Sequence, residues 1–192
     1  MTQLRAFIAI DLPQSIQNSI SKETARLQKI LGNETIRWTQ VQNIHLTLKF
    51  LGNIPNTHID FLKQILIKTA DSNSAFDLQI TSIGSFPDLK LPRVIWLGVQ
   101  SSAGLTSVQK NVEGAVSNLG YEKEARKFSP HLTLGRVRQN LHPDDLQKIR
   151  EALTNFQLGK IDPARVDSVH LYQSDLHSEG SIYTKLFSVK LK

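Results

Sequence analysis

Two tetrapeptides of the sequence, beginning at His45 and at His131, both read histidine, leucine, threonine, leucine. Imidazole exchanges protons near pH 7, and a threonine hydroxyl donates hydrogen bonds to anions. If each tetrapeptide lies in a strand, its histidine shares a face with its threonine, because side chains two residues apart point the same way. We therefore predict that His45, Thr47, His131 and Thr133 surround a phosphodiester, with one histidine as general base and the other as general acid.

The elements that carry these motifs follow one order twice: strand, helix, strand, helix, strand, with starts near residues 6 and 94. Period-two alternation and glycine or proline boundaries predict the strands, and apolar residues three or four apart predict the helices. The predicted strands are 6–11, 44–51, 76–83, 94–99, 131–137, 165–172 and 182–190. The predicted helices are 13–31, 59–69, 108–119 and 143–153.

A repeat of this length predicts two similar lobes, since solenoid repeats are shorter, at roughly 20–50 residues. We expect an α+β fold: a bilobal, duplicated α/β sandwich in which two antiparallel sheets face a central cleft and helices cover the outer faces. Residues 1–192 then form a single domain of two pseudo-symmetric lobes, approximately 1–90 and 91–192.

Composition excludes several classes of protein. The 192 residues are 40% hydrophobic and 21% charged, which is unlike a disordered chain. There is no cysteine, so disulfides and thiolate sites are excluded. The 23 Lys and Arg outnumber the 17 Asp and Glu, and this net charge of +6 favours an anionic partner such as nucleic acid. Neither a signal peptide nor a membrane span is recognisable, so we expect a cytoplasmic protein.

A zinc site is the main competing interpretation of the two histidines. Catalytic zinc takes three protein ligands, and neither motif is accompanied by a third ligand at a suitable spacing, so we predict no metal. His58, His142, His170 and His177 lack a paired context and are interpreted as structural or surface residues.

Motifs along the whole chain resemble those of the 2H phosphoesterase superfamily, and specifically the RNA 2′,3′-cyclic phosphodiesterases, also called 2′–5′ RNA ligases. The matching segments are 5–10, 45–52, 93–96, 130–136 and 174–176, with Gly180 and Tyr183.

The resemblance implies a basic cleft and hydrolysis of RNA 2′,3′-cyclic phosphate to a 2′-phosphomonoester, without metal, ATP or another cofactor. It assigns His45 as proton donor and His131 as proton acceptor, an order that the near-identical motifs alone leave open. Its implied partners are RNA with 2′,3′-cyclic phosphate or 2′-phosphate ends, tRNA halves among them, and small cyclic nucleotides. A membrane partner is not implied, and we expect a monomer. Reverse 2′–5′ ligation at the same site, and a non-catalytic RNA-binding module of the same fold, are the alternatives.

Five further residues are candidates for substrate binding. Lys49 follows the first motif with the parity of His45, although a solvated lysine is equally consistent. Arg136 matches the family's second motif, and a bulge could turn it toward the cleft. Arg126 and Phe128 precede that motif and could hold backbone and base, or Phe128 could belong to the core. The resemblance also places Ser174 in the cleft, where capping of a loop is the other interpretation.

Overall fold

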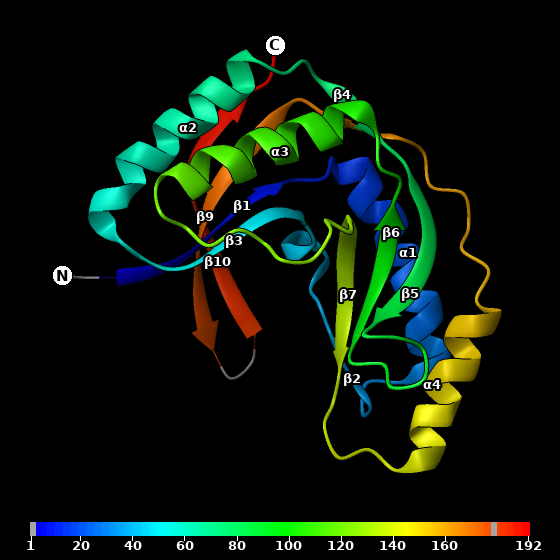
Figure 1. Cartoon of the computed structure of the whole chain (residues 1–192). Helices are drawn as coiled ribbons and strands as arrows, with labels where there is room; N and C mark the ends of the chain where they lie inside the picture. The colour runs from blue at the N-terminus through cyan, green and yellow to red at the C-terminus, as the bar shows by residue number, and fades with distance from the viewer. Residues whose placement is uncertain (1–2, 178–179) are drawn as a thin grey trace.

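The fold is described by a computed structural model for residues 3–177 and 180–192. These residues form a sheet of eight strands and a smaller one of two (Figure 1). The strands are β1 (Gln3–Ile10), β2 (Ile36–Trp38), β3 (Leu46–Pro55), β4 (Phe76–Leu78), β5 (Ile80–Phe86), β6 (Val94–Val99), β7 (His131–Val137), β8 (Ala164–Val166), β9 (Ser168–His177) and β10 (Gly180–Lys190). The helices are α1 (Gln14–Leu31), α2 (Ile59–Asp71), α3 (Ala103–Asn118) and α4 (Pro143–Asn155), with short 3-10 turns η1 (Val41–Asn43) and η2 (Asn56–His58).

The large sheet consists of two halves that meet in the middle. Its order is β10-β9-β1-β3-β7-β6-β5, and β2 pairs with β7 outside this path. The halves join where β3 meets β7, at the register pair Leu46 and Leu132. All of these pairings are antiparallel, and helices α2 and α3 lie over the first half while α1 and α4 lie beside the second (Figure 1). The predicted α+β class is confirmed.

Each half of the sheet takes strands from both halves of the sequence. The first contains β1 and β3 together with the C-terminal hairpin of β9 and β10, and the second contains β2, β5, β6 and β7. The boundary between the two sequence repeats, near residue 90, therefore does not coincide with the boundary between the two halves of the sheet.

Three short strands depart from the predicted pattern. The predicted strand 76–83 is two strands, β4 and β5, and the predicted strand 165–172 is divided between β8 and β9. β4 pairs with β8 to form the small sheet. β2 was not predicted. Each of these short strands has three residues, too few to show a period-two pattern.

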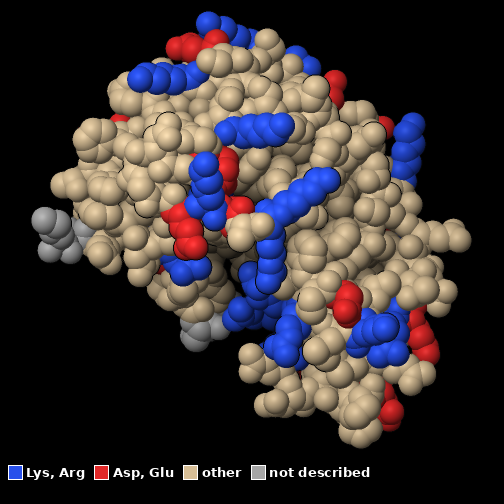
Figure 2. Space-filling view, viewed as in Figure 1, with Lys and Arg blue, Asp and Glu red and all other residues tan. Residues whose placement is uncertain are grey.

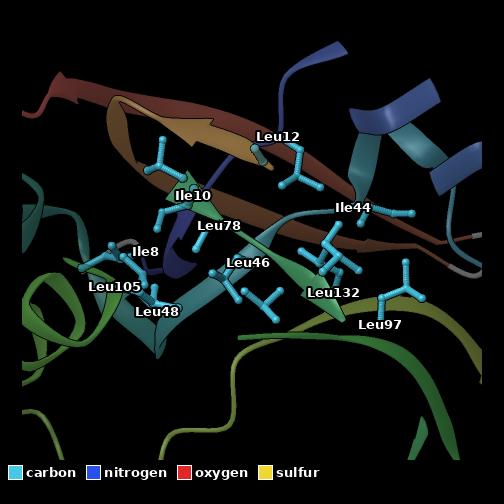
Figure 3. Close-up of a cluster of buried hydrophobic side chains, with 14 of the residues drawn as sticks. Ile8, Ile10, Leu12, Ile44, Leu46, Leu48, Leu78, Leu97, Leu105 and Leu132 are labelled. Atoms are coloured by element: carbon cyan, nitrogen blue, oxygen red, sulfur yellow. The ribbon is translucent and has the colours of Figure 1, made fainter. Parts of the chain in front are cut away.

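The leucines of both motifs lie in the core, as their parity predicts. Leu46, Leu48, Leu132 and Leu134 are all buried. Figure 3 shows the first three within one cluster that also contains Ile8 and Leu97. Their histidines and threonines consequently lie on the opposite face. Within residues 3–177 and 180–192, no helix is long and apolar enough to cross a membrane.

Candidate active site

The two motifs meet at the junction of β3 and β7. Because Leu46 pairs with Leu132 in antiparallel register, His45 lies across from Thr133 and Thr47 across from His131. All four side chains line one pocket of about 240 Å³, which we call the central pocket. The arrangement predicted from the repeat, with two imidazoles and two hydroxyls around one space, is therefore present.

Both imidazoles are held in the same way. Nδ1 of His45 lies 2.8 Å from the carbonyl oxygen of Asn43, and Nδ1 of His131 lies 2.7 Å from that of Ser129. A carbonyl oxygen only accepts hydrogen bonds, so each Nδ1 carries a proton and donates it. Each ring therefore has its Nε2 left for proton exchange with a substrate. The carbonyl in question belongs in both cases to the residue two positions before the histidine.

The ring of His45 ends a stack of aromatic side chains. Phe7 stacks on it with a centroid separation of 4.7 Å, and Tyr172 stacks on Phe7 at 5.2 Å. Tyr183 meets the edge of the imidazole at 5.1 Å. Phe7 is only 2% exposed, and it also lines the central pocket.

The far end of this stack is anchored by a carboxylate. Tyr172 donates its hydroxyl proton to Asp11 at 2.7 Å, and Lys185 Nζ donates to the same carboxylate at 2.8 Å. Burial alone would raise the pKa of Asp11, but the hydrogen bonds from Lys185 and Tyr172 hold it below the usual value. Burial and the bond to Asp11 raise the pKa of Tyr172, so Tyr172 keeps its proton. These bonds hold Tyr172, and through it Phe7, behind the histidine.

Burial of the His45 ring lowers its pKa below 6.5. The bond from Nδ1 to the Asn43 carbonyl and the charge of Asp11 act in the opposite direction, and the charge of His131 acts with burial. In the free protein at neutral pH, His45 is therefore mostly the neutral imidazole.

His131 has a different aromatic neighbour. Phe86 meets its ring edge-on, with centroids 4.8 Å apart and planes at 85°, and Trp96 lies beside Phe86 at 5.2 Å. Gly84 makes room for Trp96, because a Cβ there would lie 2.4 Å from the indole. No aromatic ring stacks face-on against His131 among the ring contacts of the described residues.

A bulge at the end of each motif decides which of the following residues face the pocket. In β3, Ile8 of β1 pairs with Lys49 and Ala9 with Thr47, so Leu48 is an extra residue. Past this bulge Lys49 turns away and Phe50, 60% exposed, lines the central pocket.

The same bulge is present in β7. Ile95 of β6 pairs with Gly135 and Trp96 with Thr133, so Leu134 is the extra residue. Past it, Arg136 lines the central pocket, which is the re-aiming that its candidate role required.

Contrary to the prediction from strand parity, Lys49 does not line the pocket, because the bulge turns its side chain away. It is 5% exposed, and its Nζ donates at 2.7 Å to both Glu113 Oε1 and the Glu122 carbonyl. Glu113 Oε1 also accepts from the backbone of Glu124 at 3.0 Å. Lys49 thus ties the loop after α3 to β3.

Of the three remaining candidates for substrate binding, one lines the central pocket and two lie outside its lining. Ser174 is buried and lines the central pocket. Arg126 is exposed on the loop between α3 and β7, outside the pocket lining. Phe128 is also outside it and packs against the core, which was the alternative for that residue.

The pocket is also lined by residues that the sequence did not predict, among them Arg5, Thr39, Asn43 and Phe50. Asn43 and Ser129 each stand two residues before a motif histidine. This shared spacing is the signal from which the role of Asn43 could be predicted. Phe50 and Arg136 occupy equivalent places, five residues after the two histidines.

Charge is concentrated around the site. In Figure 2, Lys and Arg side chains gather around the hollow between the two halves, and Asp and Glu side chains form a group to one side. No three His, Cys, Asp or Glu side chains of the described residues are grouped so as to hold a metal ion.

Several known proteins resemble this chain in sequence and in fold. An RNA 2′,3′-cyclic phosphodiesterase of Methanocaldococcus jannaschii is 32% identical over 180 residues, covering 94% of this chain and 96% of the relative. One of Thermotoga maritima is 31% identical over 189 residues, covering 98% and 96%. The crystal structure of E. coli LigT complexed with 3′-AMP superposes with a TM-score of 0.80 at 26% identity, covering 99% of both chains. Residues 10–96 and 97–183 each match the family described as LigT like Phosphoesterase, and this chain therefore belongs to that family.

Proposed function

We propose that this protein hydrolyses RNA 2′,3′-cyclic phosphate ends to 2′-phosphomonoesters, with His45 as proton donor and His131 as proton acceptor. One observation carries the proposal: two imidazoles, each fixed through Nδ1 to a carbonyl, share one pocket with two threonine hydroxyls. The names of the relatives supply the substrate class.

The reaction needs two proton transfers at opposite sides of the phosphorus. Nε2 of His131 takes a proton from water as the water oxygen attacks phosphorus. The bond from phosphorus to O3′ breaks, and Nε2 of His45 gives its proton to the departing O3′. One water is consumed, and the phosphate remains on O2′. The hydroxyls of Thr47 and Thr133 donate to the non-bridging oxygens, where charge accumulates in the transition state.

The role of His45 requires that it be protonated when substrate is bound, although burial lowers its pKa in the free protein. A phosphodiester carries a negative charge, and an opposite charge within hydrogen-bonding distance favours the imidazolium. We therefore expect substrate binding to raise the pKa of His45, and the charge of Asp11 already acts in that direction.

Arg136 and Phe50 flank the reacting group from the two halves of the sheet. Arg136 is suited to the phosphate because a guanidinium forms two parallel bonds to its oxygens. Phe50 is exposed and offers a face on which a base can stack. Ser174 offers a further hydroxyl from β9. Arg126 lies on the exposed loop between α3 and β7, and we propose that it contacts RNA chains long enough to extend beyond the pocket.

Reverse ligation would use the same groups. A 5′-hydroxyl in place of water would attack the cyclic phosphate, and expulsion of O3′ would leave a 2′–5′ diester. Water at about 55 M outcompetes RNA ends, so we propose ligation as a side activity. The proposal also includes a monomer and a single domain whose repeats divide near residue 90.

A direct test uses a short RNA ending in 2′,3′-cyclic phosphate, incubated with the protein in excess EDTA and followed by phosphorus NMR. We expect a 2′-phosphate from the wild type, about 10²–10⁴-fold slower formation with His45→Ala or His131→Ala, and unchanged rates with His142→Ala, a matched control at the exposed start of α4. Binding of the RNA without any product would instead support the non-catalytic module. Loss of activity in EDTA that added metal restores would contradict the mechanism.

A further inference from the structure

A second groove opens directly from the central pocket. Its volume is about 610 Å³, and β2, η1 and the β9–β10 hairpin form its walls. It shares with the central pocket the residues Thr39, Asn43, Arg136, Ser181 and Tyr183. A ligand in the central pocket therefore has a continuous path into this space, which we call the arginine groove.

Two arginines face this groove from adjacent strands. Arg37 of β2 is the register partner of Arg136 of β7, both side chains are exposed, and both line the groove. Two guanidinium groups on adjacent strands offer a phosphate neighbouring hydrogen-bond donors along the groove. The described residues of the lining include no Asp or Glu. The pair therefore concentrates positive charge where the groove leaves the pocket.

Another exit from the central pocket lacks this charge pattern. It shares Arg5, Ser174 and Leu176 with the central pocket and includes Asp175, whose carboxylate accepts from Gln173 Nε2 at 2.9 Å. A carboxylate repels the phosphates of an RNA chain, so electrostatics favours the arginine groove.

The walls of the arginine groove are held in place. The indole Nε1 of Trp38 donates to the Gly32 carbonyl at 3.0 Å, and Asn43 Nδ2 donates to the Ser181 carbonyl at 3.4 Å. Tyr183 packs edge-on against His45 and lines both spaces. A positively charged groove with aromatic side chains is the usual surface for single-stranded nucleic acid.

We propose that the arginine groove binds the nucleotides that precede the cyclic phosphate end, with Arg136 at the reacting phosphate and Arg37 at the next phosphodiester along the chain. This inference rests on the proposed function and adds a specificity: the protein distinguishes an RNA chain from a mononucleotide through Arg37.

The experiment compares two substrates in wild type, Arg37→Gln and Lys148→Gln. The substrates are a nucleoside 2′,3′-cyclic phosphate and an oligoribonucleotide of about eight residues with the same end. Lys148 is the matched control, because it is an exposed cation on α4 outside both spaces. We expect the ratio of kcat/KM for the oligomer to that for the mononucleotide to fall about tenfold in R37Q and to stay at the wild-type value in K148Q.

Salt dependence gives a second readout that a structural defect would not produce. Loss of one phosphate contact on a single strand should reduce the slope of log KM for the oligomer against log salt by about 0.7. An R37Q protein that keeps the wild-type ratio and slope, or loses both substrates equally, would overturn the inference while leaving the proposed function intact. A wild type that opens neither substrate would overturn the proposed function and this inference with it.

Discussion

The two motif strands repeat four residues and a bulge, yet they present different chemistry to the same pocket. After the bulge at Leu48, β3 buries a lysine and exposes Phe50 to the pocket. After the bulge at Leu134, β7 buries a glycine and exposes Arg136. The histidines differ as well, because His45 is stacked on Phe7 while Phe86 meets His131 edge-on. The repeat places two imidazoles, and the residues around each motif give the halves separate roles.

The largest expected effect separates the roles of the two histidines. A substrate with sulfur in place of the bridging O3′ has a leaving group that departs without a proton. If His45 is the donor, this substrate should restore His45→Ala by about 10²-fold or more relative to the oxygen substrate, and His131→Ala should gain nothing. Steady-state rates on both substrates measure this. Rescue of H131A alone would reverse the two assignments.

Because the bulge in β3 turns Lys49 away from the pocket, a substitution of Lys49 should lower stability rather than weaken substrate binding. Lys49→Met leaves the Glu113 carboxylate without its cation, and removing one partner of a buried pair costs about 3–5 kcal/mol of unfolding free energy. We expect that loss in urea denaturation, much of it recovered in the double variant with Glu113→Leu. Lys63→Met, which breaks an exposed pair with Asp60, is the control and should cost under about 1 kcal/mol. A large rise in KM without loss of stability would instead show that Lys49 binds the substrate.

The equivalent position in the other half is Gly135, which has no room for a side chain. A Cβ there would lie 2.8 Å from Ile36 Cγ2 and 3.1 Å from the Arg37 carbonyl oxygen. Gly135→Ala should therefore cost about 1–3 kcal/mol through overpacking, again measured in urea. Gly114→Ala on α3, where a Cβ meets nothing within 4 Å, is the matched control and should be neutral or stabilising.

These positions also show how far a sequence can predict this site. The motif, the strand parity up to Thr47 and Thr133, and the burial of the leucines were all correct, because they depend only on period-two alternation. The prediction for Lys49 failed at the bulge, since one extra residue reverses the parity of everything after it. Nothing in the residues 45–52 alone shows that register shift, which becomes visible only when β1 is paired with β3.

The aromatic stack behind His45 was beyond prediction for a different reason. It joins β1 to β9 through Phe7 and Tyr172, which are 165 residues apart in the sequence (172 − 7). The sequence repeat suggested pairing within each half of the chain, whereas each half of the sheet takes strands from both. Contacts between strands from different halves of the chain leave no pattern in any short stretch of the sequence.

Phe50 and Arg136 test the pocket itself. Arg136→Gln should lower kcat/KM about 10–100-fold, because it removes charge-assisted bonds to the phosphate. Phe50→Ala should cost about 5–100-fold if a base stacks there, and Phe50→Tyr, which keeps the ring face, should recover most of that. Parallel assays on substrates with a purine or a pyrimidine end measure the stacking. An F50A variant as active as the wild type would show that Phe50 does not bind the substrate.

The smallest effect concerns the dependence of stability on pH, and it follows from the burial of the His45 ring. Burial lowers the pKa of His45 in the folded protein, so between about pH 6.5 and that lower value the unfolded chain binds a proton that the folded chain does not. Stability is therefore full above about pH 6.5 and decreases as the pH falls toward the folded-state pKa. Burial lowers the pKa of His170 in the same direction. Urea denaturation from pH 7.5 to pH 5 should show this decrease, reduced in His45→Gln and in His170→Gln. An unchanged slope in H45Q would mean that burial of the His45 ring does not disfavour the imidazolium.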